Sequence, residues 1–358
     1  MLECLTGGSA PLSPQLSNPS APCRRRFRLP ALLALAVLAV ALPAGATTTL
    51  LNASYDVSRE FYRDYNPAFV AHWSGTTGEV LAINQSHGGS SRQARSVLDG
   101  LEADVVTMNQ ANDIDLLADR GHLLAGDWAR RFPDASAPTT SVSVILVRKG
   151  NPKQIRDWSD LGRPGITFLM PNPKTSGNGR YGYLAAWGAA RKSGVAENAI
   201  PAAIGRILAN VPVFDGGGRA AATSFAQRQI GDALVTFESE VPLIRAEFGD
   251  HFDVVYPPWT ILAENPVAVV DAVAARHGTQ RQAQAYLQYL WSDEGQEIAA
   301  RHHLRPRNAA ILARHGAEFP PVRTFTVGEM FGGWRQAQHE HFDDAARYDR
   351  LLAADPRH

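Results

Sequence analysis

Strand-like and helix-like apolar segments alternate along most of the chain. Short β-branched runs predict strands, and longer runs with apolar residues every three or four positions predict helices. Strands are expected at 48–51, 79–84, 104–107, 142–147, 165–170 and 211–214. Helices are expected near 57–73, 91–101, 180–193, 220–229, 281–291 and 294–302. This alternation predicts an α/β fold in which helices cover both faces of mostly parallel sheets.

Two proline-marked bends divide this pattern into two lobes. The extended segments 139–147 and 261–271 follow Pro138 and Pro257-Pro258, and we interpret them as crossings between the lobes. The first lobe is then expected to comprise 47–138 and 267–315. The second comprises 139–266 together with the C-terminal segment 316–358. Because ligands of such sheets bind beyond the carboxyl ends of the strands, the site is expected in the cleft between the lobes.

The first 46 residues have the order of a secretory signal peptide. A basic cluster at 24–28 precedes an apolar stretch at 29–42 and the small residues Ala44-Gly45-Ala46. The apolar stretch is shorter than the roughly 20 residues that a membrane-spanning helix needs. We therefore expect cleavage near Ala46 and export to the periplasm. Residues 1–22, rich in Pro, Ser and Ala, are expected to form an unstructured extension.

Composition and charge narrow the class of protein. The chain is 45 % hydrophobic and 20 % charged, as in ordinary globular proteins. Both cysteines, Cys4 and Cys23, precede the apolar stretch, so the mature chain is expected to have neither disulfides nor cysteine chemistry. The first 46 residues hold four arginines and one glutamate, which leaves a slightly acidic remainder. That balance gives no electrostatic reason to expect nucleic-acid or acidic-membrane partners.

Four segments place Gly, Ser or Asp just before predicted helices. They are Ser54-Tyr55-Asp56, Gly88-Gly89-Ser90, Ser176-Gly177-Asn178 and Gly216-Gly217-Gly218. A helix start offers N–H groups without internal partners, at the positive end of the helix dipole. Glycine lets a ligand approach the backbone, and serine adds a hydroxyl. Each segment alone is also typical of an ordinary cap or turn, but four together predict a pocket that holds an anion with neutral donors.

The residue spacing gives less support for a bonded cation, a metal site or a catalytic site. Arg180 and Arg219 lie just inside predicted helices and could balance the anion without contacting it, or be ordinary surface arginines. His339-Glu340-His341 lacks the i, i+4 spacing that places two histidines on one helix face, so no metal is expected. No G-x-S-x-G motif occurs, and no nucleophile with an activating base can be assembled. We therefore expect neither an enzyme nor a cofactor.

At these residues the chain resembles the periplasmic sulfate- and thiosulfate-binding proteins that feed ABC importers. The matching phrases lie at 51–60, 85–90, 147–153, 171–177, 183–188, 261–264 and 331–334. The resemblance implies a two-lobe periplasmic-binding fold of type II that closes over one dehydrated oxyanion. It also implies a monomeric receptor whose partners are sulfate or thiosulfate and the inner-membrane permease subunits of an importer.

The resemblance also implies which residues hold the anion. In the family, backbone N–H groups, a serine hydroxyl and a tryptophan N–H bind the ligand without a bonded cation. Carried over, the donors are Asp56, Ser90, Ser176, Gly177, Asn178 and Gly218, and Gly89, Arg180, Arg219 and Phe237 line or surround the pocket.

Two positions depart from the family's pattern. Asn178 stands where the family has a second glycine, and Phe237 stands where the sulfate-binding branch has its tryptophan. Phenylalanine has no N–H to donate. The segments 56–60, 174–178 and 236–241 resemble the thiosulfate-binding branch more, whereas Gly88-Gly89 resembles the sulfate branch. We therefore expect thiosulfate to be bound alongside sulfate, with little dependence on pH because every bonded group is a neutral donor.

Two alternative functions stay open at this point. One is a receptor for another tetrahedral oxyanion, such as phosphate or molybdate. Phosphate near neutrality carries a proton and needs an acceptor, for which the predicted pocket offers Asp56 alone. The other is a secreted hydrolase of phosphate or sulfate esters, which requires a nucleophile or a metal set.

Overall fold

Residues 47–354 are described by the computed structural model. The basic cluster, the apolar stretch, both cysteines and the expected cleavage site at Ala46 lie outside the described residues. In the described part, no helix is long and apolar enough to span a membrane.

The first sheet has four strands in the order β10-β3-β1-β2. Its strands are β1 (Thr48–Tyr55), β2 (Leu81–Gly88), β3 (Val105–Thr107) and β10 (Val267–Val269). β1 pairs in parallel with β2 and β3, and β10 is antiparallel to β3. The register sets Tyr55 opposite Gly88 and Ser54 opposite Thr107. The segments that follow β1, β2 and β3 therefore leave the sheet at one edge.

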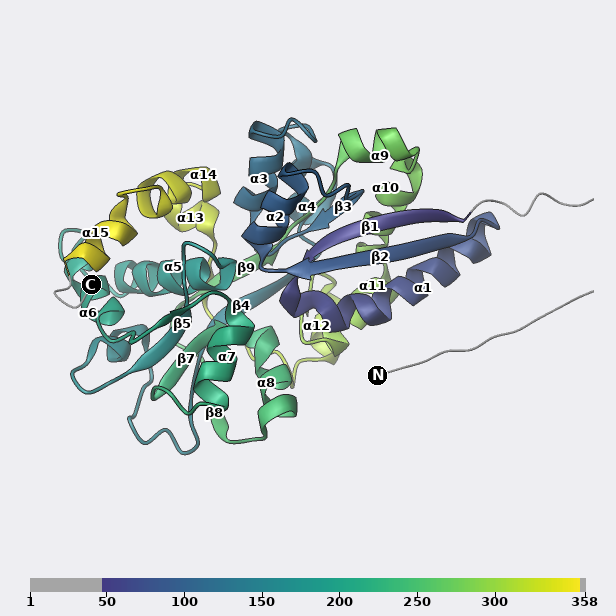
Figure 1. The fold of residues 1–358 in the computed structure, drawn as a ribbon. Helices are drawn as coiled ribbons and strands as arrows, with labels where there is room; N and C mark the ends of the chain where they lie inside the picture. Colours follow the sequence, from purple (N-terminus) through teal and green to yellow (C-terminus); the bar gives the residue numbers. More distant parts are fainter. Residues whose placement is uncertain (1–46, 355–358) are drawn as a thin grey trace, which may run out of the picture. The chain divides into compact units, whose positions relative to one another are not determined.

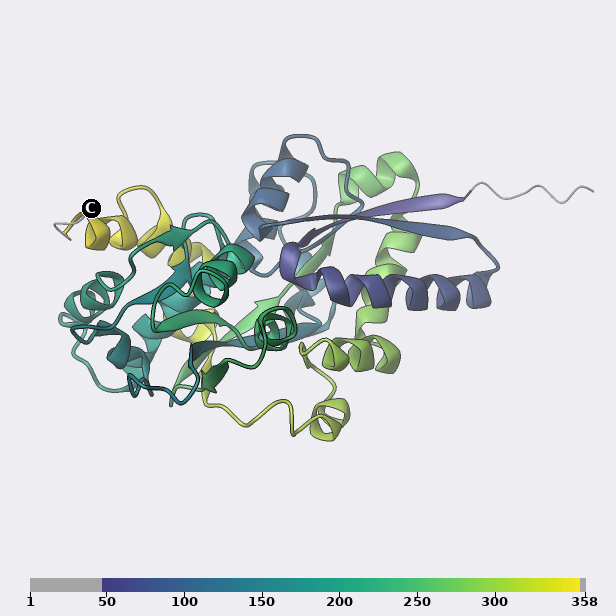
Figure 2. The ribbon, with the colours of Figure 1, turned by 60° about the horizontal axis from the view of Figure 1, so that its bottom comes forward.

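Helices cover both faces of this sheet. They are α1 (Arg59–Thr77), α2 (Ser90–Leu98), α3 (Ala111–Asp119), α9 (Asp271–His277), α10 (Gln280–Gln288) and α11 (Asp293–Arg301). Figures 1 and 2 both show α1 running alongside β1 and β2. The alternation along β10 explains the two covered faces: Val267 and Val269 pack with α1 and α10, whereas Ala268 packs with α2 and α3.

The second sheet has eight strands, with the order β12-β9-β4-β7-β5-β6 and with β8 and β11 also paired to β4. These strands are β4 (Thr139–Arg148), β5 (Phe168–Pro171), β6 (Phe214–Asp215), β7 (Ala233–Phe237), β8 (Phe252–Val255), β9 (Thr260–Asn265), β11 (Arg305–Pro306) and β12 (Thr324–Phe325). β5 is parallel to β6 and β7, whereas β4 runs antiparallel to β7, β8 and β9. The parallel strands β5 and β6 thus end at the same edge.

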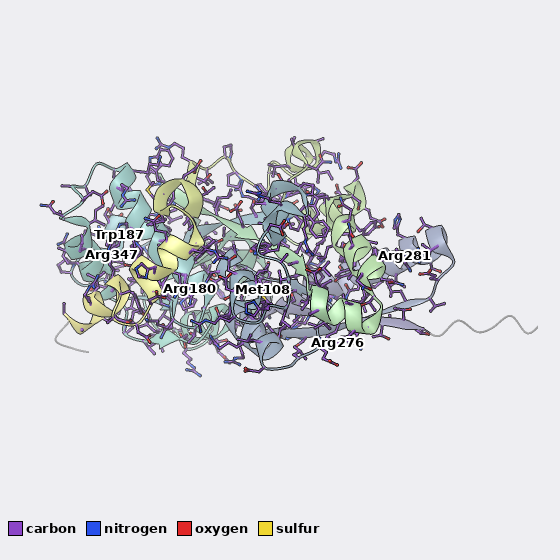
Figure 3. All side chains as sticks on the ribbon, turned by 90° about the horizontal axis from the view of Figure 1, so that it is seen from above. Met108, Arg180, Trp187, Arg276, Arg281 and Arg347 are labelled. Atoms are coloured by element: carbon purple, nitrogen blue, oxygen red, sulfur yellow. The ribbon has the colours of Figure 1, made fainter. Side chains whose placement is uncertain are left out.

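Two apolar layers enclose the second sheet. One holds α5 (Gly177–Lys192) and α6 (Ile200–Leu208) together with α13 (Val327–Phe331), α14 (Trp334–Ala337) and α15 (Arg347–Ala353) from the C-terminal part. The Arg347 guanidinium lies 5.5 Å from the Trp187 ring of α5, and both residues are labelled in Figure 3. The other layer holds α7 (Gly218–Ala226) and α8 (Val241–Phe248). The C-terminal helices are therefore part of the core around this sheet.

Short elements complete the described chain. They are the helices α4 (Pro133–Ser136) and α12 (Ala309–Arg314), the 3-10 helices η1 (Asp56–Ser58), η2 (Trp128–Arg130), η3 (Trp158–Gly162), η4 (Glu238–Glu240) and η5 (Tyr289–Trp291), and the π-helix η6 (Gln338–Phe342).

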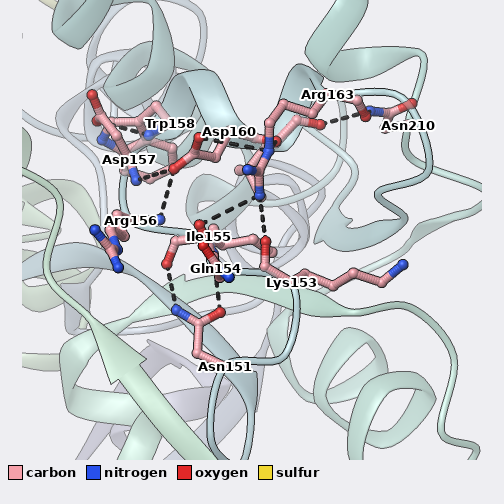
Figure 4. Close-up of polar contacts among 11 residues, drawn as sticks. Asn151, Lys153, Gln154, Ile155, Arg156, Asp157, Trp158, Asp160, Arg163 and Asn210 are labelled. Carbon is pink, nitrogen blue, oxygen red and sulfur yellow. Dashed lines mark hydrogen bonds and ion pairs between the residues drawn. The ribbon is translucent and has the colours of Figure 1, made fainter.

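The long connection from β4 to β5 is ordered by its own polar groups, as Figure 4 shows. The Asn151 amide donates to the Ile155 carbonyl at 2.7 Å and accepts from the Ile155 N–H at 3.0 Å. Asp157 and Asp160 form a reciprocal capping box at η3, and Asn210 donates to two carbonyls beside it. These bonds satisfy backbone groups that the sheet does not pair.

Every strand and helix expected above overlaps an observed element, but several bounds were wrong. The helices expected from 180 and 220 begin at Gly177 and Gly218, and β2 runs on through Gly88. Glycine's low helix propensity applies to helix interiors, whereas these glycines occupy first turns whose N–H groups lack helical partners. The predicted donors Gly177 and Gly218 therefore lie in the first turns of helices rather than in loops before them.

Candidate anion-binding site

The first sheet brings two helix starts to one edge. Asp56 opens η1 directly after β1, and Ser90 opens α2 directly after β2 and Gly89. The pairing of Tyr55 with Gly88 sets these starts side by side. Neither start has a side-chain cap, so its first N–H groups are available to a ligand.

A third loop of the same sheet fixes the Ser90 hydroxyl. The Ser90 side chain is buried, and its Oγ accepts a hydrogen bond of 3.2 Å from the backbone N–H of Asn109, just after β3. Because the Asn109 N–H is the donor, the Ser90 hydroxyl hydrogen can still donate. The Ser90 hydroxyl is therefore a neutral donor at the edge where the helix starts meet.

The second sheet supplies two more helix starts at one edge. Ser176 is the N-cap of α5, without a side-chain capping bond, and Gly177 and Asn178 form its first turn. Gly218 opens α7 after β6. The loops before α5 and α7 are tied together, since Thr175 Oγ1 donates to the Gly216 carbonyl at 3.1 Å.

The helix starts of the two sheets lie against each other. A Cβ placed on Gly177 would lie 2.1 Å from Asn109 Oδ1, and a Cβ on Gly89 would lie 3.8 Å from the Thr175 carbonyl oxygen. Gly177 therefore admits no side chain while Asn109 keeps this position. The contacts join the start of α5 to the ends of β2 and β3, which places four of the predicted donors in one region.

Asn178 and Gly218 meet at a buried carboxyl group. Asn178 Nδ2 donates to Glu240 Oε1 at 2.8 Å, and Thr236 Oγ1 donates to Glu240 Oε2 at 3.0 Å. A Cβ placed on Gly218 would lie 2.8 Å from Glu240 Oε2 and 3.1 Å from Asn178 Nδ2. The starts of α5 and α7 are thus linked through Glu240.

A salt bridge connects α7 to α1, close to Asp56. Arg219 Nη2 lies 3.0 and 2.9 Å from the two carboxylate oxygens of Glu60. Glu60 follows Asp56 by one helical turn, and the charge of Asp56 also raises the pKa of Glu240, after the larger effect of burial. All the predicted donors therefore belong to one neighbourhood.

A model of the family described as bacterial extracellular solute-binding protein matches residues 50–305. The chain belongs to this family. Its two sheets with flanking helices form the two-lobe, type II fold that the sequence predicts.

Several named relatives align with most of this chain. The chain is 56 % identical over 317 residues to the thiosulfate-binding protein of Pseudomonas aeruginosa, with 88 % of this chain and 96 % of the relative covered. It is 49 % identical over 304 residues to the sulfate-binding protein of Escherichia coli, with 84 % and 92 % covered. Among solved structures, the sulfate-binding protein SubI from Mycobacterium tuberculosis H37Rv aligns with a TM-score of 0.73 at 31 % identity, covering 83 % of this chain and all of that chain.

The two predicted arginines of the solute-binding protein have different surroundings. Arg180, labelled in Figure 3, is buried, and its Nε donates to the Pro173 carbonyl at 2.9 Å. Burial lowers its pKa, an effect that nearby Asp113 opposes, and its Nη1 has no hydrogen-bond partner among the described residues. Arg219 is held by Glu60 at the surface. The side-chain bonds of these arginines are therefore to Pro173 and Glu60, and not to the predicted anion donors.

Phe237 lies at the end of β7, close in sequence to Glu240. It is buried and packs edge-on against Tyr181 at 5.7 Å between ring centroids. Its position at the end of β7 sets it beside Glu238–Glu240, so an aromatic N–H donor is missing at this place.

Sequence reasoning missed two polar side chains at this site, Asn109 and Glu240. Asn109 and Gln110 follow the strand predicted at 104–107. Because parallel strands end at one edge of a sheet, this position could have predicted that they lie near the site. Glu240 lies in the segment 236–241, which resembles the thiosulfate-binding branch, but no local sequence pattern predicts its contact with Asn178. Within residues 47–354, no group of three or more His, Cys, Asp or Glu side chains is placed to hold a metal ion.

Proposed function

We propose that this solute-binding protein is a periplasmic receptor that binds sulfate or thiosulfate and delivers it to an ABC importer for sulfur assimilation. The observation that carries the proposal is the meeting of uncapped helix starts in a chain 56 % identical to a protein named as thiosulfate-binding. Buried anions need many donors to replace their hydration, and helix N-termini supply them.

Each donor has a defined role in the proposal. The backbone N–H groups of Asp56, Gly177, Asn178 and Gly218 bind oxyanion oxygens, and Ser90 and Ser176 add their hydroxyl groups. Gly89 allows close approach at α2. Arg180 and Arg219 contribute positive potential without touching the anion.

Phe237 is proposed to shift the preference toward thiosulfate. A charge-assisted hydrogen bond is worth about 1.5–3 kcal/mol, which a tryptophan N–H could contribute to sulfate at this position and a phenyl ring cannot. Thiosulfate replaces one oxygen by a larger sulfur, which is a weaker acceptor. Such an atom fits beside a buried ring edge better than a fourth oxygen does.

The remaining features follow from the same proposal. The signal peptide is cleaved near Ala46, the mature receptor is a monomer without catalytic activity, and permease subunits in the inner membrane receive the anion. We propose lobe boundaries as the sequence predicts them, with 47–138 and 267–315 in the first lobe and 139–266 with 316–358 in the second.

Isothermal titration of the ligand-free protein with thiosulfate and with sulfate tests the function. We expect 1:1 binding of both anions. Competition by phosphate at equal concentration would favour the receptor for another oxyanion, and turnover of a chromogenic ester that Ser176→Ala abolishes would favour a hydrolase. Absence of heat and of a thermal shift with both sulfur anions would refute the proposal.

A matched pair of serine variants tests the site. Ser176→Ala removes a hydroxyl at the start of α5, and Ser193→Ala removes an exposed hydroxyl at its other end. Loss of a bond to a charged group costs about 1.5–3 kcal/mol, so Ser176→Ala should weaken binding by about 10- to 150-fold. Ser193→Ala should bind like the wild type. Equal affinities of all three proteins would contradict the assignment.

A further inference from the structure

Glu240 is a buried carboxyl group among the proposed anion donors. It is 3 % exposed and ends η4, directly before α8. It makes no capping bond to α8, since its oxygens contact Asn178 and Thr236 instead. Its carboxyl also lies within 3 Å of the Cβ position of Gly218. A charge on Glu240 would therefore lie directly beside a bound anion.

The surroundings of Glu240 favour its neutral form. The groups that face it are Asp56 from η1, Tyr55 from β1, Asn178 from α5, Thr236 from β7 and Arg219 from α7. Arg219 is the cation among them, and it is already paired with Glu60. Burial, followed by repulsion from Asp56, raises the pKa of Glu240 to about 7, and these effects outweigh the hydrogen bonds from Thr236 and Asn178 and the charge of Arg219, which lower it.

We propose that Glu240 is a neutral carboxylic acid in the anion site, where it positions Asn178 and the start of α7, and that loss of its proton weakens anion binding. This inference rests on the proposed receptor function and names a positioning residue for it. A bound dianion opposes the negative charge on Glu240, so binding and protonation favour each other.

A cavity gives the buried carboxyl a route for its proton. It has a volume of about 150 Å³ and is lined by Val57 of η1, Arg219, Glu240 and the exposed Glu247 of α8, among others. Water at the polar part of this cavity, beside Arg219, Thr223 and Glu247, can exchange a proton with Glu240.

Linkage sets the expected size of the effect. Affinity is full at a pH below the pKa of Glu240 in the free protein, and it falls as the pH rises through that value. Once the free protein has lost this proton and the complex has kept it, the affinity falls by about tenfold for each pH unit. This behaviour differs from the nearly pH-independent binding that neutral donors alone predict.

Titrations of thiosulfate and sulfate at pH 6 and pH 9 test the inference with three proteins. The wild type should bind at least about tenfold more weakly at pH 9. Glu240→Gln keeps an oxygen acceptor for Asn178 and is neutral at both pH values, so it should bind equally at both. Glu247→Gln, the same change on the exposed face of α8, should keep the wild-type pH dependence.

A measurement on the wild type alone guards against a variant that does not fold. Titration near pH 7.5 in two buffers of different ionisation enthalpy should reveal proton uptake on anion binding. Equal wild-type affinity at pH 6 and pH 9, no proton uptake, or a Glu240→Gln protein with the wild-type pH dependence would overturn the inference and leave the receptor function standing. Absence of binding by the wild type at pH 6 would overturn the receptor function, and the inference with it.

Discussion

Gly177→Ala should weaken anion binding without destabilising the ligand-free protein. The new methyl carbon would lie 2.1 Å from Asn109 Oδ1 and 2.8 Å from its Cγ. Ordinary contacts between such atoms need about 3.5 Å, so α5 and the Asn109 side chain must separate by roughly 1.4 Å. Forced overpacking costs about 1–3 kcal/mol. Because the clash joins the ends of the two sheets, it opposes closure rather than the folding of either lobe.

The corresponding loss of affinity is about 5- to 150-fold, measured by calorimetry with thiosulfate. Gly217→Ala is the matched control, since a Cβ there meets nothing within 4 Å and the residue caps α7 in the same site. It should bind like the wild type. The reasoning fails if Gly177→Ala keeps the wild-type affinity, or if its ligand-free melting temperature falls while its affinity does not.

Three further predictions address preference, stability and pH. Phe237→Trp introduces an N–H donor, so it should raise the affinity for sulfate relative to thiosulfate in paired titrations. An unchanged ratio of the two affinities would contradict the role given to the Phe237 ring. Gly188→Ala places a Cβ 2.3 Å from the Phe325 ring, so it should lower stability by about 1–3 kcal/mol in denaturant unfolding and leave anion affinity unchanged. His341, bonded to Tyr183, has its pKa lowered from 6.5 to about 4 by burial, so stability should fall as the pH drops from 6.5 toward 4. His341→Phe should flatten that part of the stability profile, and an equally steep fall in the variant would exclude this histidine as its cause.

The helix starts could be predicted because their signals are local. A short apolar run, then Gly, Ser or Asp, then a helical period marks the end of a strand and the start of a helix. Asp56, Ser90, Ser176 and Gly218 each stand in such a segment, and each is found at a helix start. The rule that parallel strands end at one edge then places them in one region of each sheet.

Elements and contacts without local signals could not be predicted. The five-residue strand Ala233–Phe237 is too short for periodicity to separate it from a buried helical turn. The contact of Glu240 with Asn178 spans 62 positions and depends on how α5 and β7 pack. The clash that keeps position 177 a glycine depends on Asn109, from the other sheet. Side-chain contacts between distant elements need the three-dimensional arrangement.

The neighbourhood of the donors raises an electrostatic problem that Glu240 resolves. Helix starts attract anions, but Asp56 and Glu240 bring carboxyl groups into the same region. Two negative charges there would offset much of the attraction, because a charge beside a buried dianion is poorly screened. A neutral Glu240 removes one of them and still accepts the hydrogen bond that orients Asn178. In the proposed site, anion binding therefore requires a proton on Glu240, and we expect the pH at which Glu240 loses it to set the upper limit of the range over which the receptor binds.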